Sequence, residues 1–192
     1  MQGPFGEAAV FLIDTLFWLY ILAVLLRFLF QVVRADFYNA FSQALVMITN
    51  PAVRLFRRFI PGLYGIDLAS VLLLLILQCL KNYLLGLIRF GASFKLLGLA
   101  VFSAAELLNL VIWVFIVAIF IRVILSWVAP HGRYNPAMGL LISLTEPLML
   151  PARRLIPPMS GLDLSPISVF ILLYLTLILI VSPLMAFGRG LL

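Results

Sequence analysis

Residues 50–70 read NPAVRLFRRFIPGLYGIDLAS, and residues 146–166 read EPLMLPARRLIPPMSGLDLSP, so one segment occurs twice in this chain. The second copy follows at a spacing of 96 residues. It repeats a proline, an Arg-Arg pair, an Ile-Pro turn and a Gly-x-Asp end. A repeat of roughly ninety residues is too long for a solenoid unit. The duplication therefore predicts a tandem of two similar modules.

The composition indicates that the bilayer is the solvent of these modules. The chain is 65% hydrophobic and 10% charged, whereas soluble domains are about 45–50% apolar and about 25% charged. A hydrocarbon core of about 30 Å needs about 20 apolar helical residues. We therefore predict an all-α membrane protein with four transmembrane helices, over 8–33, 68–90, 104–128 and 164–187.

The order of these spans defines the domain organisation. The first repeat covers 8–90, an apolar linker covers 91–103, and the second repeat covers 104–187. Because each repeat holds two spans, both repeats are expected to enter the membrane in the same direction, as parallel two-helix units. The N-terminal apolar run is too long for a signal peptide and lacks a basic start. The lone Cys79 can form no intrachain disulfide.

The distribution of Lys and Arg predicts the orientation. Most basic residues near the spans lie in the two long connectors, so we expect a cytoplasmic (inner) membrane protein with cytoplasmic connectors and both termini outside. The net charge of +6 is assigned to topology and to anionic headgroups, and we expect no nucleic-acid contact. The connector residues are Arg34, Arg54, Arg57, Arg58, Arg133, Arg153 and Arg154, and those on the opposite side are Arg89, Lys95 and Arg189.

The connectors, 37–59 and 134–155, are amphipathic. Apolar residues recur in both at three- and four-residue spacing. This pattern predicts helices that lie in the membrane interface with the apolar face toward the acyl chains. Pro51 and Pro147 are expected to interrupt them, because proline removes a hydrogen-bond donor and clashes with the preceding turn. Re-entrant half-helices are the alternative.

Asp67 and Asp163 each open a span after a glycine turn. As helix caps, their carboxylates would accept free N–H groups and favour the positive end of the helix dipole. The second interpretation pairs them with Arg27 and Arg122, which lie at similar depth, either within a repeat or swapped between repeats. A charge at that depth is costly unless it is paired. These pairs would be structural clasps.

The duplicated Arg-Arg pairs are interpreted as anchors at the cytoplasmic face. A specific site for phosphate headgroups or for a protein partner is the alternative, because paired arginines suit bidentate phosphate contacts. Gly65 and Gly161 are expected to supply a positive φ that a Cβ would hinder. The two pairs are Arg57-Arg58 and Arg153-Arg154.

One asymmetry separates the two copies. Asp14 and Lys81 lie in the spans of the first repeat, where the second repeat has Asn109 and Leu177. Both charges are on the order of 10 Å from the ends of their spans, at about 1.5 Å per residue. Their joint presence in one copy and joint absence from the other predicts a buried ion pair. Alternatively, Lys81 extends alone toward the interface and Asp14 faces a small water pocket.

The duplicated block resembles the YggT family of small bacterial and plastid membrane proteins. The resemblance covers nearly the whole chain as two family domains, and residues 153–158 and 161–166 match most fully. The first copy departs at Gly62 and at Ala69-Ser70, so its turn is expected to be looser. The resemblance implies an integral cytoplasmic-membrane protein. It also implies links to cytochrome b6f assembly and nucleoid organisation in plastids, and to osmotic or potassium stress and cell-division genes in bacteria.

The residues form no catalytic, metal or cofactor motif, and the single His131 lies in a loop. We therefore expect a non-enzymatic scaffold or assembly factor whose partners are anionic lipid headgroups and other membrane proteins, or a second copy of the chain. A small channel or transporter for potassium or an osmolyte is the alternative, and a membrane enzyme is a third. The residues polar enough to line a path through the spans are Asp14, Gln78, Lys81 and Asn109.

Overall fold

The computed structural model describes residues 3–58, 60, 67–91, 95–128, 136–156 and 163–192. These residues form helices and no strands. Four of the helical segments are long and apolar enough to cross a bilayer, namely α1, α3, α4 and the continuous α6–α7. The predicted all-α fold with four candidate spans is confirmed. The elements are α1 (Pro4–Val32), α2 (Ala40–Arg57), α3 (Leu68–Phe90), α4 (Leu96–Val128), α5 (Pro136–Leu155), α6 (Ser165–Thr176), the π-helical η1 (Leu177–Val181) and α7 (Ser182–Leu191).

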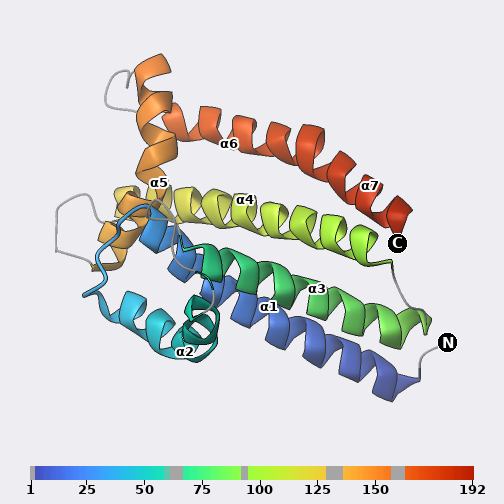
Figure 1. Cartoon of the computed structure of the whole chain (residues 1–192). Helices are drawn as coiled ribbons and strands as arrows, with labels where there is room; N and C mark the ends of the chain where they lie inside the picture. The colour runs from blue at the N-terminus through green and yellow to red at the C-terminus, as the bar shows by residue number, and fades with distance from the viewer. Residues whose placement is uncertain (1–2, 59, 61–66, 92–94, 129–135, 157–162) are drawn as a thin grey trace.

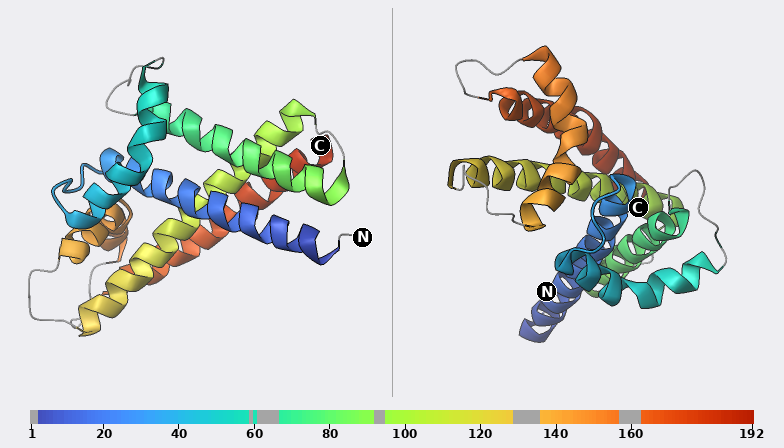
Figure 2. Two further views of the ribbon diagram at one scale, coloured as in Figure 1. Left: turned by 90° about the horizontal axis from the view of Figure 1, so that it is seen from below. Right: turned by 90° about the vertical axis from the view of Figure 1, so that its left-hand side faces the viewer.

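The spans form a bundle with two distinct ends (Figure 1). Both chain termini lie at one end, which we call the terminal side, together with the end of α3 and the start of α4. The helices α2 and α5 lie at the opposite end, the connector side, and run across the direction of the spans (Figure 2). The helix α4 is central, because it packs against α3 of the first repeat and against α7 of its own. The interface between the repeats is thus built around α4.

The buried core lies toward the connector side. Ile21, Val24 and Leu25 of α1 are almost fully buried there, whereas Phe5 and Phe11 near its start are exposed. Exposed apolar side chains are the expected surface of a helix that contacts lipid tails. The first half of α1 is therefore the part of this helix with the fewest partners inside the chain.

Two glycines bring α4 and α7 close together at the terminal side. A Cβ at Gly98 would lie 2.6 Å from the backbone of Leu191, and one at Gly188 would lie 2.7 Å from the backbone of Phe102. Small residues allow membrane helices to approach at backbone distance. The guanidinium of Arg189 lies 5.3 Å from the centre of the Phe102 ring, which adds a cation–π contact at the same crossing.

The structure corrects the predicted start of the third span and the predicted interruptions of the connector helices. The third span begins at Leu96, so most of the predicted linker 91–103 belongs to α4, because its residues are apolar and contain no proline. The predicted interruptions at Pro51 and Pro147 are wrong, since α2 and α5 continue through both prolines. Packing of the connector against the spans outweighs the lost hydrogen bond.

Several predicted features fall on residues that the structure leaves undescribed. These are the positive φ of Gly65 and Gly161, the loose turn at Gly62 and the loop position of His131. The interfacial placement of α2 and α5 concerns the bilayer itself and stays a prediction.

Candidate functional site

Two charged residues meet inside the spans of the first repeat. The Nζ atom of Lys81 in α3 lies 3.4 Å from Oδ1 of Asp14 in α1. The lysine side chain is 10% exposed and the aspartate side chain 53%. The ion pair expected from the asymmetry of the repeats is therefore present, but only its lysine is buried.

A second carboxylate, Glu106 of α4, joins the two repeats. Its Oε2 atom accepts hydrogen bonds from Nε2 of Gln78 and Nδ2 of Asn82 in α3, both at 2.7 Å. The Nδ2 atom of Asn82 also donates to Oγ of Ser103 at 3.0 Å. Gln78 and Ser103 are buried. A polar network thus crosses the interface between the repeats within the predicted membrane region.

The ion pairs found in the described part of the chain do not include Glu106. The nearby Lys81 pairs with Asp14 instead. A charged group within a membrane span is costly unless it is paired or solvated, and it marks a functional site by default. Glu106 is therefore the strongest functional candidate in the spans.

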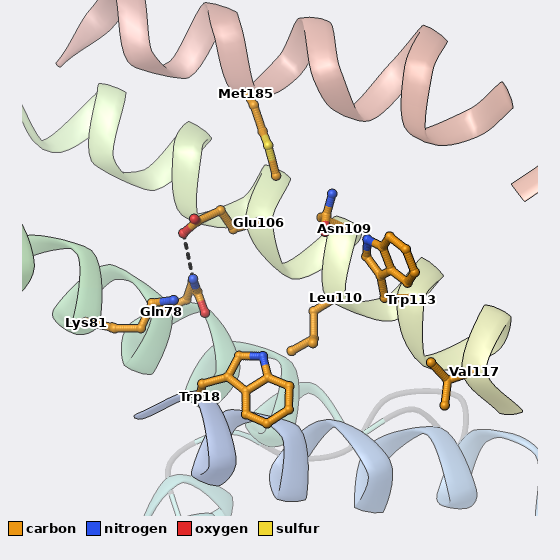
Figure 3. Close-up of a pocket in the computed structure, with 9 residues that line it drawn as sticks. All are labelled: Trp18, Gln78, Lys81, Glu106, Asn109, Leu110, Trp113, Val117 and Met185. Atoms are coloured by element: carbon orange, nitrogen blue, oxygen red, sulfur yellow. Dashed lines mark hydrogen bonds between the residues drawn. The ribbon is translucent and has the colours of Figure 1, made fainter. Parts of the chain in front are cut away.

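A pocket of about 380 Å³ opens beside this network (Figure 3). Figure 3 shows Trp18 of α1 and Met185 of α7 pointing toward this space from opposite sides, with Glu106 and Gln78 at one end of it. Residues of four spans and of both repeats thus form one cavity. Its lining consists of Trp18, Gln78, Lys81, Glu106, Asn109, Leu110, Trp113, Val117 and Met185.

Of the four residues that the sequence indicated as polar enough to line a path, Gln78, Lys81 and Asn109 line this pocket and Asp14 does not. The sequence did not indicate Glu106, which also lines the pocket, or Asn82 and Ser103, which belong to the hydrogen-bond network. The reason is the start of the third span. With a span from 104, Glu106 lies at the membrane edge, whereas α4 begins at Leu96 and places it ten residues inside. That distance is about 15 Å along a helix. The signal was a carboxylate within an unbroken apolar run.

A different network holds each connector helix to its span. Arg27 of α1 donates from Nη1 to Oγ1 of Thr49 at 2.8 Å and from Nη2 to Oδ1 of Asn50 at 3.0 Å. In the second repeat, Arg122 donates to Oγ1 of Thr145 at 2.6 Å and to Oε2 of Glu146 at 2.8 Å. Each of these arginines therefore binds the connector of its own repeat.

The predicted clasps between Arg27 and Asp67 and between Arg122 and Asp163 are accordingly wrong. The arginines and aspartates lie at similar depth, but each guanidinium group donates its hydrogen bonds to a threonine and to the next residue of the connector instead. Thr49 and Thr145 occupy matching positions 96 residues apart, each immediately before its copy of the duplicated block. Extending the comparison by one residue would have revealed this signal.

The first arginine of each Arg-Arg pair binds the aspartate that precedes the next span. The Nη2 atom of Arg57 lies 2.6 Å from Oδ2 of Asp67, and Nε of Arg153 lies 3.0 Å from Oδ2 of Asp163. These arginines are thus ion-pair partners as well as basic flanking residues. The second arginines, Arg58 and Arg154, are exposed and form no ion pair with any described residue.

The two aspartates differ as helix caps. Asp67 occupies the cap position of α3, but its carboxylate accepts from Oγ of Ser70 at 2.7 Å and makes no capping bond to a backbone N–H. Asp163 lies one residue before Leu164, the cap residue of α6, and its Oδ1 atom accepts from the backbone N–H of Ser165 at 3.0 Å. The predicted capping bond is therefore found only in the second repeat.

The same contacts lower the pKa of both carboxyl groups. Burial alone would raise the pKa of Asp67, but hydrogen bonds from Arg57 and Ser70 outweigh it, so the pKa lies below its usual value. Burial likewise opposes the shift at Asp163, where hydrogen bonds from Ser165 and Arg153 lower the pKa. Both groups are ionised at neutral pH.

The second repeat has the more continuous network. Glu146 accepts from Arg122 and also, through Oε1, from Nη1 of Arg153 at 3.2 Å. The first repeat has the neutral Asn50 at this position, and there Arg57 donates instead to Oε1 of Gln31 at 3.3 Å. Among the described residues, a chain of charged contacts therefore runs from span to span through the connector in the second repeat and not in the first.

Comparisons with known proteins find similar proteins in several bacteria. It is 46% identical over 182 residues to protein PA0392 of Pseudomonas aeruginosa, covering 94% of this chain and 92% of that protein. It is 46% identical over 168 residues to a protein of the proC 3' region of Vibrio alginolyticus, covering 84% and 86% respectively. No solved structure matches it.

The same comparisons recover the internal duplication. The chain is 38% identical over 183 residues to protein YggT of Escherichia coli, covering 95% of this chain and 94% of that protein. The profile of the CCB3/YggT family matches twice, over residues 6–88 and 101–184. The two matches coincide with the first repeat, α1 to α3, and with the second, α4 to α7. The chain therefore belongs to the CCB3/YggT family, as a multi-pass membrane protein with two tandem family domains.

Proposed function

We propose that this protein is a non-enzymatic membrane scaffold that helps to assemble or organise a larger membrane complex. The observation that carries the proposal is the position of Asp14. Its side chain is 53% exposed on the first half of α1, among the exposed Phe11, Leu12 and Leu16. Lys81 lies 3.4 Å from Oδ1 of this carboxylate, but lipid tails, which suit the apolar residues, offer nothing to the exposed part of the group. A partner that presents a hydrogen-bond donor or a cation would cover it.

The two connector networks support the same function. Buried or half-buried hydrogen bonds join α1 to α2 and α4 to α5, so each connector is held in a fixed position on its span. The scaffold lies in the cytoplasmic membrane with its connectors on the cytoplasmic side. Arg54, Arg58 and Arg154, which are exposed, bind anionic headgroups there. A rigid unit with a defined depth and orientation suits a scaffold.

Photo-crosslinking in native membranes tests this proposal. A crosslinking residue replaces Phe11 on the Asp14 face, and the control replaces Leu179 in η1, which is equally exposed. We expect a discrete protein adduct from position 11, lost when Asp14→Asn is added, and only lipid adducts from position 179. Lipid adducts alone from both positions, with or without Asp14→Asn, would contradict the proposal.

The pocket beside Glu106 supports a second candidate, a small channel or transporter for a cation. A membrane path needs polar groups along the spans, and the structure adds Glu106, Asn82 and Ser103 to those that the sequence suggested. Potassium flux into liposomes that contain the purified protein separates the two candidates. A flux that Glu106→Gln abolishes supports transport, and an absence of flux above empty liposomes supports the scaffold.

A further inference from the structure

A second cavity continues the pocket beside Glu106 toward the connector side. It has a volume of about 340 Å³ and shares four lining residues with the first pocket. Its remaining walls come from α1, α2, α4 and α5 and are apolar, with Phe30, Ala118 and Leu144 among them. The interface between the repeats therefore contains a polar compartment joined to an apolar one. The shared residues are Trp18, Leu110, Trp113 and Val117.

The polar compartment is suited to a positive charge. One oxygen of Glu106 accepts from Gln78 and Asn82, and no described cationic side chain pairs with this carboxylate. Within a membrane an uncompensated carboxylate attracts a cation strongly, because the local dielectric is low. Lys81 also lines this compartment but is paired with Asp14, so an anionic group would meet no unpaired cation among the described lining residues, and a neutral group would leave the charge of Glu106 uncompensated.

Two indole rings favour an organic cation over a bare metal ion. Trp18 and Trp113 line both compartments, one from each repeat. The faces of tryptophan rings attract ammonium groups, most strongly where water is excluded. The apolar cavity beyond them offers nothing to a hydrated metal ion, but it can bury the hydrocarbon part of a larger ligand.

We propose that the interface between the repeats binds a lipophilic organic cation. Its charged centre lies at Glu106 beside Trp18 and Trp113, and its apolar part occupies the cavity next to Ala118. Both compartments need residues of both repeats, so the site exists only in the tandem chain. The site lies between the spans, and Asp14, on which the scaffold role depends, does not line it, although its partner Lys81 does.

Equilibrium dialysis with protein in nanodiscs of zwitterionic lipid tests this site. The probe is radiolabelled dodecyltrimethylammonium below its micelle concentration, and protein-free nanodiscs give the background. Unlabelled dodecanol and dodecyl sulfate have the same tail with a neutral or an anionic head. We expect saturable binding of one probe per chain, which unlabelled dodecyltrimethylammonium displaces and the other two compounds do not.

Three variants separate the site from adsorption to lipid. Glu106→Gln keeps the shape of the side chain and removes its charge, so affinity should fall at least tenfold. Ala118→Phe fills the apolar cavity without touching a charge and should weaken binding similarly, which keeps the test decisive if Glu106→Gln fails to fold. Glu7→Gln removes an exposed carboxylate near the N-terminus and should change nothing. Equal displacement by all three compounds, or unchanged affinity in a folded Ala118→Phe variant, would overturn the proposal.

Discussion

At the scale of single residues, each charged side chain inside the bundle binds the polar groups that lie within hydrogen-bond or ion-pair distance of it. In the part of the chain that the structure describes, the buried Lys81 has one carboxylate within ion-pair distance, that of Asp14 on the neighbouring helix α1. The guanidinium groups of Arg27 and Arg122 donate hydrogen bonds to the connector helices and not to an aspartate. The contact from arginine to threonine that holds each connector is therefore shared by the two repeats, whereas the pair of Asp14 and Lys81 belongs to the first repeat alone.

Replacing Asp14 tests the ion pair with Lys81. Asp14→Asn leaves the buried lysine unpaired, which costs at most about 2.5–3.5 kcal/mol on insertion scales. The melting temperature in detergent should fall. Asp14→Asn combined with Lys81→Leu, which removes both charges as in the second repeat, should recover much of that loss, because a buried pair can be replaced by apolar groups. A double variant that is less stable than Asp14→Asn alone would contradict a structural pair.

The lowered pKa of Asp67 predicts how stability depends on pH. The pKa of an aspartate in the unfolded chain is about 3.9, and the pKa of Asp67 in the folded protein is lower. The contribution of this group is therefore complete above about pH 3.9 and is lost as pH falls through the lower, folded pKa. Asp67→Asn should lower the melting temperature at pH 7, and the difference from wild type should shrink below about pH 4. A difference that is constant from pH 7 to pH 3 would show that the charge is irrelevant.

Sequence and depth were enough to predict some of these contacts and not others. The pair of Asp14 and Lys81 followed from comparing the copies, because two charges vanish together. The partners of Arg27 and Arg122 did not follow, since several polar groups lie within reach of a long arginine and only the placement of the connector decides among them. Glu106 was missed because its depth depends on where α4 begins.

At the scale of elements, hydropathy predicted the four spans, and amphipathic spacing predicted the two connectors. The helix α4 is longer than predicted because nothing in residues 96–103 stops a helix, and the chain reverses before Leu96. The connectors pass through Pro51 and Pro147 because their apolar faces are packed, as the full burial of Val53 shows. The expectation that proline interrupts a helix was therefore wrong where tertiary packing compensates for the lost hydrogen bond.

Gly188 tests the close approach of α4 and α7. Gly188→Ala would place a Cβ 2.7 Å from the backbone of Phe102, so the helices must separate and the melting temperature should fall. Gly139→Ala in α5 is the matched control, since no heavy atom lies within 4 Å of its Cβ position. Alanine is favoured over glycine in helices by up to about 1 kcal/mol, so the control should be neutral or stabilising. A stabilised Gly188→Ala variant would contradict the crossing.

At the scale of the whole molecule, duplication has placed two similar units side by side and formed a site at their interface. The connectors lie at one end and the termini at the other. The excess of basic residues in the connectors predicts that this end lies in the cytoplasm. Alkaline phosphatase fused after Leu192 should therefore be active and a GFP fusion there dark. A fluorescent GFP fusion with a silent phosphatase fusion would reverse the orientation.

We expect the hydrogen bond between Gln78 of the first repeat and Glu106 of the second to hold the two repeats together within the membrane. A double-mutant cycle with Gln78→Leu, Glu106→Leu and both changes tests it most directly, with thermal unfolding of the detergent-solubilised protein as the readout. Because each single change strands its partner, the double variant should lose less stability than the two single losses combined, with a coupling of about 0.5–3 kcal/mol. Fully additive losses would show that the two side chains act independently and that the polar network does not join the repeats.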